Sequence, residues 1–437
     1  MPNRITHNNV SVFVGPAPAT GYHYINYNGE KINPVGSPTG SYYNLVFPFL
    51  RVQSFSYDAN LTRPNATFIG SESIIVDDLT DQEFNLQLSY LQHGIINELR
   101  AGFYANFYES GSTAYGHFIK PAISGFVNRS MAKTNSYPIS DSIQHHSPLD
   151  YRDCRNIFLV VDKDDGQDLV ESYSQKTTDS SNKVVYGFGN CYLTSYSASA
   201  SVGSFPECSI SYTSDNMEMY GSPLYQTIPA LDPSTGDNPS IEFSLPPFSE
   251  NDTSYEYISS VVKPSNISVR IAEVNNLTSK KAVMGTGNLP SSYSSAMSSA
   301  ISSLNVQSYD LSINFNRKSL SRIGDKIPKD RAIESPILID LSFDVIDDEN
   351  VFNFMQERYN LNKEFYISLT LNNSTGNFVD VQYDMLRLKC TNFGTSYGIS
   401  QNASKKFSFQ GDINPYDTTK GFFISGSKNT YKRNLEF

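Results

Sequence analysis

The sequence lacks most of the features by which a function class is recognised at first sight. It has no tryptophan, it has only four cysteines in 437 residues, and charged residues make up just 18% of the chain. No apolar run approaches the roughly 20 residues that a membrane-spanning helix needs, and no apolar stretch of a signal peptide follows Met1. We therefore expect a protein that is made and folded in a cytosol and has no membrane partner.

The cysteines and the missing motifs exclude several kinds of chemistry. The cysteines lie far apart and form no CxxC pair, so we expect free, mostly buried thiols and not a disulfide framework. The sequence contains no GxSxG, HExxH, Walker or Rossmann motif. We expect neither a cofactor nor an enzymatic activity. The four cysteines are Cys154, Cys191, Cys208 and Cys390.

Two patterns offer metal-ligand residue types without the geometry that a site needs. The acidic stretch from Asp162 to Asp168 resembles the start of a calcium loop, but Gly166 comes one place early for an EF-hand and no Glu closes the loop. His145 and His146 are adjacent, so on a strand they would point to opposite faces. We interpret the first stretch as an acidic turn and the second as an exposed polar loop.

Charge and composition favour a β-rich protein that does not grip nucleic acid. The net charge is −11, whereas phosphate binding needs clustered Lys and Arg; a negative surface would instead let DNA pass without sticking. Aromatic residues make up 13% of the chain, all of them Tyr and Phe. Together with abundant Ser, Asn, Thr and Gly, they are typical of strands with polar faces and many turns.

The most informative feature that is present is an internal repeat. Residues 52–70 and 306–324 align without a gap and share seven identities in 19 positions, whereas unrelated sequences would share about one. The identities pair Val52, Gln53, Ser54, Asn60, Arg63, Ile69 and Gly70 with Val306, Gln307, Ser308, Asn314, Arg317, Ile323 and Gly324. The chain therefore contains two copies of one unit.

Both copies begin with a strand that has one dry face and one wet face. Apolar and polar residues alternate over 54–61 and over 308–315 in the same register, which is the period of a half-buried strand. A slip of one residue would exchange the faces, so the shared register is meaningful. The predicted wet, or lumen-lining, residues are Ser54, Ser56, Asp58, Ser308, Asp310 and Ser312.

The repeat continues beyond the first strand. The alternating run Phe84–Tyr90 corresponds, after one gap, to Ile337–Phe343, and each run is followed by a predicted helix, near 93–104 and 348–359. A later strand pair is clear over 196–212, and its counterpart over 393–409 is weaker. Each copy therefore has the order strand, long hairpin loop, strand, helix.

Composition divides the chain into four parts. At this length two domains with separate cores are expected, and the repeat offset agrees. Pro and Gly punctuate the start of the chain and the stretch between the copies. The predicted parts are an N-terminal arm (1–47), a first domain with an insertion at 105–155 (48–225), a linker and connecting segment (226–305), and a second domain with a C-terminal arm (306–437).

The repeated arginines are the most specific candidates for an interface. Arg63 and Arg317 follow their strands by the same interval, and we interpret them as making ion pairs between domains or subunits. Gly70 and Gly324 would provide turns with positive φ, and Gln53 and Gln307 would hydrogen-bond laterally across a sheet. We predict that these six residues belong to an assembly interface.

Three stretches together resemble the tail tube proteins of long-tailed bacteriophages. The first runs from Val52 through Arg63 to Gly70, the second is Asn190–Pro206, and the third runs from Val306 through Arg317 to Pro336 and the strand after it. The resemblance covers about half of the chain. The arm, the insertion and the linker have no counterpart in it.

The resemblance implies a fold and a role. It implies a mainly β (α+β) chain of two tandem tail-tube-like β-sandwich domains, each with a flanking helix and a long hairpin loop. Such two-domain members form trimeric rings with pseudo-sixfold symmetry, which stack into a hollow tube whose lumen is a closed β-barrel. The implied partners are further copies of the chain and the tape measure, terminator and baseplate proteins, with DNA only as passing cargo. The implied location is the virion tail, after assembly in the host bacterial cytoplasm.

Other interpretations stay open at this point. Related folds occur in tail terminators and baseplate hubs, which are alternative positions in the tail. A glycan-binding β-sandwich adhesin would suit the Tyr- and Asn-rich loops, although adhesins are usually exported. A virion-associated glycan hydrolase needs two carboxylates that meet in space, and no motif supports it.

Overall fold

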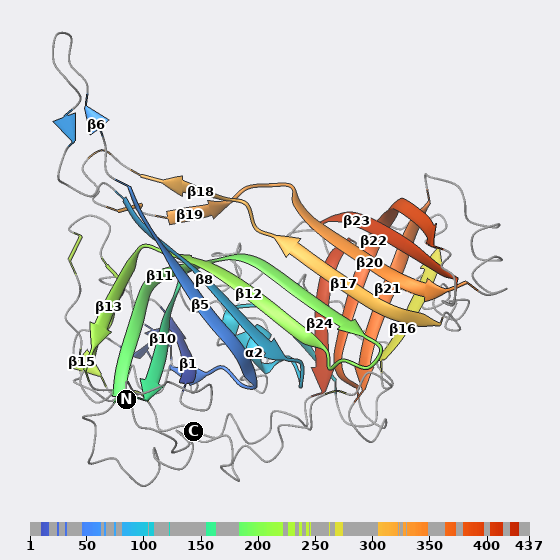
Figure 1. The fold of residues 1–437 in the computed structure, drawn as a ribbon, viewed down its shortest axis with the longest axis horizontal. Helices are drawn as coiled ribbons and strands as arrows, with labels where there is room; N and C mark the ends of the chain where they lie inside the picture. The colour runs from blue at the N-terminus through green and yellow to red at the C-terminus, as the bar shows by residue number, and fades with distance from the viewer. Residues whose placement is uncertain are drawn as a thin grey trace, which may run out of the picture.

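The structure is a computed structural model, which describes the strands and the short segments that connect them. The described residues are 10–16, 46–62, 81–103, 154–162, 183–221, 226–231, 267–273, 305–321, 330–347, 363–372, 379–396, 403–413 and 420–427, with a few shorter pieces. Nearly all of them lie in strands (Figure 1), so the expected mainly β fold is confirmed. Among the described residues, no helix is long and apolar enough to cross a membrane.

The ladders described for the first copy join eight strands, and one helix follows β8. Long strands of alternating polarity pair with their neighbours in antiparallel ladders, in the spatial order β4-β1-β10-β11-β12-β8-β5, and β13 also pairs with β11. The elements are β1 (Val10–Pro16), β4 (Phe47–Pro48), β5 (Val52–Thr62), β8 (Asp81–Leu91), α2 (Ile96–Ala101), β10 (Cys154–Asp162), β11 (Lys183–Ser201), β12 (Glu207–Ser214) and β13 (Asn216–Tyr220).

The second copy has the same order of strands. Its ladder runs β16-β21-β22-β23-β20-β17, and β24 also pairs with β22. The order of the strands along the chain and their pairing therefore match between the copies. In this match β16 is equivalent to β1, and β22 is equivalent to β11. The elements are β16 (Ile267–Glu273), β17 (Val306–Asn314), β20 (Ile337–Ile346), β21 (Glu364–Asn372), β22 (Val379–Ser396), β23 (Ser404–Ile413) and β24 (Gly421–Ser427).

Smaller elements complete the description. Hairpins β6–β7 and β18–β19 follow β5 and β17, respectively, and β9 pairs in parallel with β24, which ties the first copy to the second. The bounds are β2 (Tyr24–Ile25), β3 (Lys31–Ile32), β6 (Asn65–Ala66), β7 (Ile74–Ile75), β9 (Ala105–Tyr108), β14 (Gln226–Thr227), β15 (Glu242–Phe243), β18 (Arg317–Leu320) and β19 (Asp330–Ile333).

Each copy folds into two layers because one long strand serves both. The first half of β11 pairs with β10 and β13, and its second half pairs with β12. Phe188 in the back layer packs against three aromatic rings of the front layer. Its ring centroid lies 6.0 Å from that of Phe55, 5.2 Å from that of Tyr57 and 6.4 Å from that of Phe84. The apolar faces of the two layers thus enclose a core, as in a β-sandwich.

The copies share a core. The buried apolar residues of both copies form one contiguous cluster, contrary to the expectation of separate cores, and a smaller cluster lies on the outer side of the back layer of the first copy. The three cysteines Cys154, Cys191 and Cys208 are buried, Cys390 is half-buried, and all four are free thiols, as expected.

Local irregularities repeat along with the strands. An extra residue makes a bulge at Gln53 in β5 and at Gln307 in β17, and another at Thr194 in β11 and at Thr391 in β22. A further register shift follows Arg155 in β10 and the equivalent Phe365 in β21. Because bulges set local twist and direction, their recurrence shows that the two copies share one backbone design.

The ladders correct part of the predicted alignment. Phe55 faces Leu88, whereas its equivalent Tyr309 faces Phe343. The run Phe84–Tyr90 therefore corresponds to Ile339–Val345 and not to Ile337–Phe343. A shift of two residues preserves the faces of a strand, so alternation alone could not reveal the error. The weaker counterpart over 393–409 is confirmed, since β22 and β23 occupy the places of β11 and β12.

The remaining predicted elements agree in part. The first helix is shorter than expected, covering Ile96–Ala101, and ends at Gly102, whose φ of 115° is left-handed. The second predicted helix, near 348–359, lies outside the described residues. Strand β1 falls within the predicted arm and β16 within the predicted connecting segment, so each copy begins earlier in the chain than the repeat in sequence indicates.

Two residues at equivalent positions of the copies share a left-handed backbone conformation. Asn190 (φ 53°) and Arg387 (φ 60°) occupy equivalent places in β11 and β22. The side chain of Asn190 hydrogen-bonds both main-chain groups of Leu231, at 2.8 and 3.2 Å. The side chain of Arg387 instead makes a 3.8 Å ion pair with half-exposed Glu364, which is a weaker kind of contact.

We expect opposite effects from the same substitution at these two positions. Arg387→Gly should raise the free energy of unfolding by about 0.5–1 kcal/mol because glycine avoids the left-handed penalty. Asn190→Gly should lower it by about 1–2 kcal/mol because two hydrogen bonds are lost. Urea denaturation measures both, and changes of the same sign would contradict the interpretation.

Candidate assembly surface

The front layers of the two copies form one continuous sheet of eight strands. The order is β5-β8-β12-β11 from the first copy and β17-β20-β23-β22 from the second, and β11 pairs with β17 from Ser195 to Ser201. The strands run side by side across the front of the molecule (Figure 1). Because the junction is an ordinary antiparallel ladder, the two copies present one surface.

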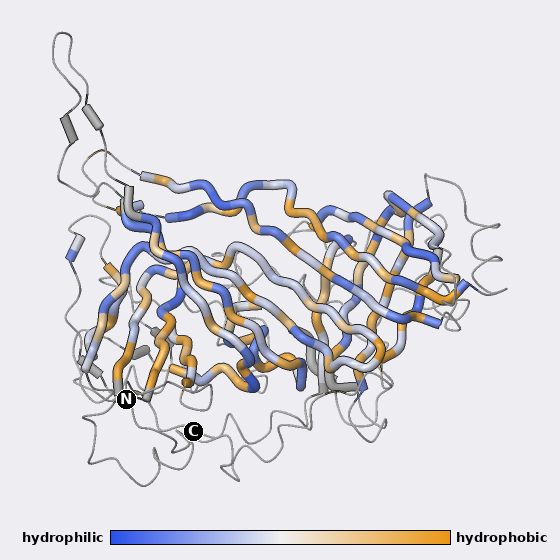
Figure 2. The backbone as a smooth tube through the Cα atoms, in the orientation of Figure 1, coloured by the Kyte–Doolittle hydropathy of each residue, from blue (hydrophilic) through white to orange (hydrophobic). Residues whose placement is uncertain are grey.

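One face of this sheet is lined with small polar side chains in rows across the strands. Along each strand these polar residues alternate with apolar residues whose side chains are buried on the other face. This alternation gives the strands their mixed blue and orange colouring in Figure 2. One complete row, read from β5 to β22 through successive ladder partners, consists of Ser54, Ser89, Ser209, Ser197, Ser312, Asp340, Gln410 and Lys389.

The predicted wet residues all lie on this polar face. Ser54, Ser56, Asp58 and Asp310 are exposed, and Ser308 and Ser312 are half-buried. Equivalent hydrogen bonds link β5 to β8 and β17 to β20: the hydroxyls of Ser54 and Ser89 lie 2.7 Å apart, and Ser308 donates to Asp344 at 2.8 Å. The wet face thus exists as a surface, while its role as a lumen stays a prediction.

The polar face is acidic. Seven carboxylates lie on it against two lysines, and serine fills most other places, so no cluster of basic residues is present on its described part. A surface of this kind repels phosphate. The charged members are Asp58, Glu83, Glu207, Asp310, Asp340, Asp344 and Asp412, with Lys389 and Lys406.

Gln53 and Gln307 occupy the equivalent bulges described above. The amide of Gln53 donates to the carbonyl of Arg51 at 3.3 Å, and that of Gln307 donates to the carbonyl of Asn305 at 3.5 Å. In both cases the acceptor lies two residues earlier in the chain. These bonds are therefore local, and they are not the lateral bonds across the sheet that the sequence predicted. Their predicted place in an assembly interface is not tested.

Arg317 connects the copies within one chain. Its Nε donates to the carbonyl of Leu193 in the first copy, Nη1 donates to the carbonyl of Arg331 at 2.8 Å, and the guanidinium lies 5.4 Å from the ring centre of Tyr192. These contacts link the two domains, through a carbonyl and an aromatic ring. Arg63, Gly70 and Gly324 lie outside the described residues, so their predicted interface role stays a prediction.

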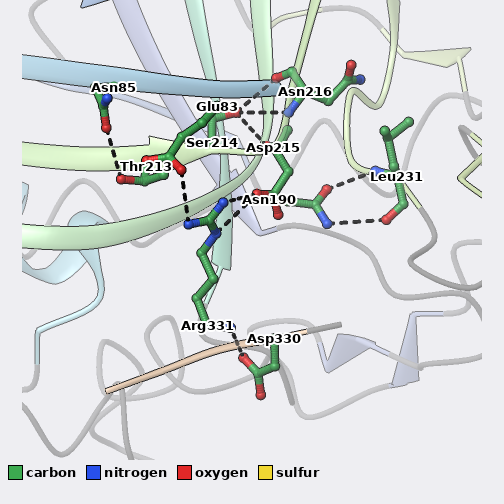
Figure 3. Close-up of polar contacts among 11 residues, drawn as sticks. Glu83, Asn85, Asn190, Thr213, Ser214, Asp215, Asn216, Leu231, Asp330 and Arg331 are labelled. Carbon is green, nitrogen blue, oxygen red and sulfur yellow. Dashed lines mark hydrogen bonds and ion pairs between the residues drawn. The ribbon is translucent and has the colours of Figure 1, made fainter. Parts of the chain in front are cut away.

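An ion pair between the copies is made by a residue that sequence reasoning missed. Arg331, in hairpin β18–β19 of the second copy, binds Asp215 of the first copy with Nη2 at 2.6 Å and Nε at 3.1 Å (Figure 3). Glu83 lies 3.7 Å from Nη1. Asp215 is only 2% exposed and Arg331 only 12%, so this pair is shielded from water and stronger than a surface pair.

The repeat could not have revealed Arg331. The long loop of the first copy has no second arginine after Arg63, so the residue has no counterpart to match. Asp215, the acidic partner of Arg331, does have a counterpart in the second copy. The ladders make Asp412 its equivalent, and Asp412 forms a half-exposed ion pair with Lys420. That signal becomes visible only after the ladders correct the alignment.

A buried polar cluster lies where the helix of the first copy meets β8 and β11 of the first copy and the back-layer half of β22 of the second copy. The hydroxyl of Tyr90 donates to Glu98 at 2.8 Å, that of Tyr196 donates to it at 3.2 Å, and the hydroxyls of Tyr196 and Tyr383 lie 2.8 Å apart. Burial raises the pKa of Glu98 above its usual range. The cluster joins Tyr383 of the second copy to the first copy by specific hydrogen bonds.

The structure offers no metal centre among the residues it describes. No group of three or more His, Cys, Asp or Glu converges there. The predicted acidic turn after Asp162 and the polar loop at His145 and His146, with Asp150 and Asp153, lie outside the described residues.

Comparisons with known proteins find only distant similarity. No family model matches the sequence, and no curated protein does. Solved structures that match in part are a chain of the anti-feeding prophage baseplate, symmetrised sixfold (9% identity, 37% of this chain and 93% of that one, TM-score 0.25), and a chain of the tail of an empty GTA particle in C6 symmetry (10%, 35% and 94%, TM-score 0.21). A third is a chain of the tube-terminating cap of the anti-feeding prophage (12%, 38% and 91%, TM-score 0.22). Similarity at this level indicates neither family membership nor function.

The buried ion pair predicts a large and asymmetric mutational effect. Arg331→Met should lower the free energy of unfolding by about 3 kcal/mol because it removes the guanidinium that pairs with the buried carboxylate of Asp215. Lys420→Met removes the equivalent but exposed pair and should cost less than about 1 kcal/mol. Adding Asp215→Asn to Arg331→Met should recover part of the loss. Urea denaturation of all four proteins measures this, and equal effects of the two single cation substitutions would contradict it.

Proposed function

We propose that this chain is the subunit of a bacteriophage tail tube, in which copies join edge to edge into rings and the rings stack into a hollow tube. The observation that carries the proposal is the eight-stranded sheet, in which two copies of one unit already join strand to strand. A sheet that grows by repetition of the same junction can close on itself, and closure removes the exposed edges.

The chemistry of the polar face suits the inner wall of such a tube. Small hydroxyl side chains line it in rows, and carboxylates outnumber lysines. A wall of this kind hydrogen-bonds to water and repels DNA phosphates, so DNA would pass along it without binding. The sequence resemblance to two-domain tail tube proteins supports the same role and three chains per ring, which would give a barrel of 24 strands from the eight strands of each chain.

Apolar tips at opposite ends of the sheet support stacking of the rings. The turn between β11 and β12 exposes Val202 and Phe205 by 67% and 55%, and the β18–β19 hairpin exposes Leu320 and Ile323. The main-chain NH of Val202 donates a hydrogen bond to the carbonyl of Gln307, so the turn lies beside the start of β17. The β18–β19 hairpin follows the other end of β17. The two tips therefore face away from each other (Figure 1), as a head-to-tail stack requires.

Assembly is the first property to measure. Negative-stain electron microscopy and sedimentation velocity of the purified chain, over a range of concentrations, should detect rings and hollow stacked tubes with three chains per ring. Rings that never stack would favour a terminator or baseplate hub. A chain that stays monomeric at every concentration would overturn the proposal.

The apolar turn should control stacking but not ring formation. The double variant Val202→Glu/Phe205→Glu should leave rings intact and raise the concentration needed for tubes at least tenfold, since burial of these two side chains is worth about 2–4 kcal/mol. Met219→Glu, an equally exposed position on β13 away from both tips, should form tubes as the unchanged protein does. Normal tubes from the double variant would exclude this turn from the contact.

A further inference from the structure

The two outer edges of the eight-stranded sheet are equivalent to the two strands that meet at its centre. Within the described part of the chain, the ladder partners of β5 all belong to β8, and those of Asn392–Ser396 in β22 all belong to β23. By the repeat, β5 stands for β17, and Asn392–Ser396 stand for Ser195–Ser199 in β11. The central junction is the pairing of those two equivalents.

We propose that β5 of one chain pairs with the end of β22 of a second copy of this chain, in the register that β11 and β17 display inside the molecule. The proposal rests on the proposed ring assembly and specifies its contact residue by residue. At the central junction Tyr196 faces Ile313, Ser197 faces Ser312 and Ala198 faces Leu311. Their equivalents are Phe393 facing Ala59, Gly394 facing Asp58 and Thr395 facing Tyr57.

Exposure of side chains on the apolar face identifies both edges as incomplete. Tyr57 is 37% exposed and Phe393 is 38% exposed, although both point to the side of the sheet that is otherwise buried. Their equivalents at the central junction, Leu311 and Tyr196, are 0% exposed. The exposed part of the aromatic side chain at each edge would be covered if the edges met as the central strands do.

The residues brought together are compatible in size and charge. The large ring of Phe393 would face the small Ala59, and Thr395 would face Tyr57. On the polar face Gly394 would face Asp58, and no pair of like charges results, which an antiparallel pair would not tolerate. A shift of one residue would place Phe393 opposite Asp58 and exchange the faces, so the register is specified by the pattern of each strand.

A cysteine pair tests the register directly. In a Cys390→Ser background, Asp58→Cys/Gly394→Cys should form disulfides between chains on mild oxidation, giving covalent dimers and a closed covalent ring on denaturing gels. A Cβ on Gly394 would meet nothing within 4 Å, so the substitution fits the fold. Directly opposed residues lie about 4.5–5.5 Å apart at Cβ, close to disulfide geometry.

Three controls separate register from assembly and from misfolding. Ser197→Cys/Ser312→Cys, the equivalent pair at the central junction, should link within one chain only. Ser56→Cys/Gly394→Cys lies two residues out of register, on the same face, and should link at least tenfold more slowly. A mixture of the two single variants, Asp58→Cys and Gly394→Cys, should yield one linked dimer, whereas each alone should yield none.

The outcomes distinguish this inference from the proposed function. Rings in the microscope with fast linking of Asp58→Cys to Gly394→Cys support both. Rings in which the Ser56 pair links faster, or neither pair links, overturn the register while the tube subunit stands. A chain that neither forms rings nor links between chains overturns both.

Discussion

The main-chain ladder between β11 and β17 is the interaction on which the rest of this structure depends. It joins β11, at one edge of the front layer of the first copy, to β17, at one edge of the front layer of the second, and so turns two four-stranded layers into one sheet. Main-chain pairing requires no particular side chains, so the copies could diverge in sequence while keeping the junction. The shared apolar core follows, since the side chains behind a continuous sheet necessarily meet.

Side-chain interactions then orient the two copies about that ladder. On one side of the sheet, hairpin β18–β19 reaches back over the first copy, where Arg331 binds buried Asp215 and Arg317 reaches a main-chain carbonyl. On the other side, the hydroxyl groups of Tyr196 and Tyr383 meet beside Glu98 in the core. Buried polar contacts are costly when misaligned, so these contacts favour one arrangement of the copies over others that the ladder alone would allow.

The same design accounts for the difference between the inside and the outside of the molecule. Junctions that are complete inside the chain bury their aromatic residues, whereas the outer edges leave Tyr57 and Phe393 partly in water. A soluble monomer normally protects its sheet edges with charge, bulges or covering segments. Edges that instead resemble an internal junction are what the proposed assembly of copies requires.

The sequence by itself determined the repeat, the faces of its strands and the mainly β class, because period-two alternation is written locally along the chain. It placed all six predicted wet residues on one polar face, and it identified the bulge positions Gln53 and Gln307 as special without indicating why. It aligned the second strand of the one copy with that of the other two residues out of place, because a shift of two leaves alternation unchanged. It also missed Asp215 and Arg331, which are far apart in sequence and meet only after β12 and the β18–β19 hairpin are in place. Only the tertiary structure decided which strands are central and which are edges, because that depends on long-range main-chain pairing, and main-chain groups are the same at every position.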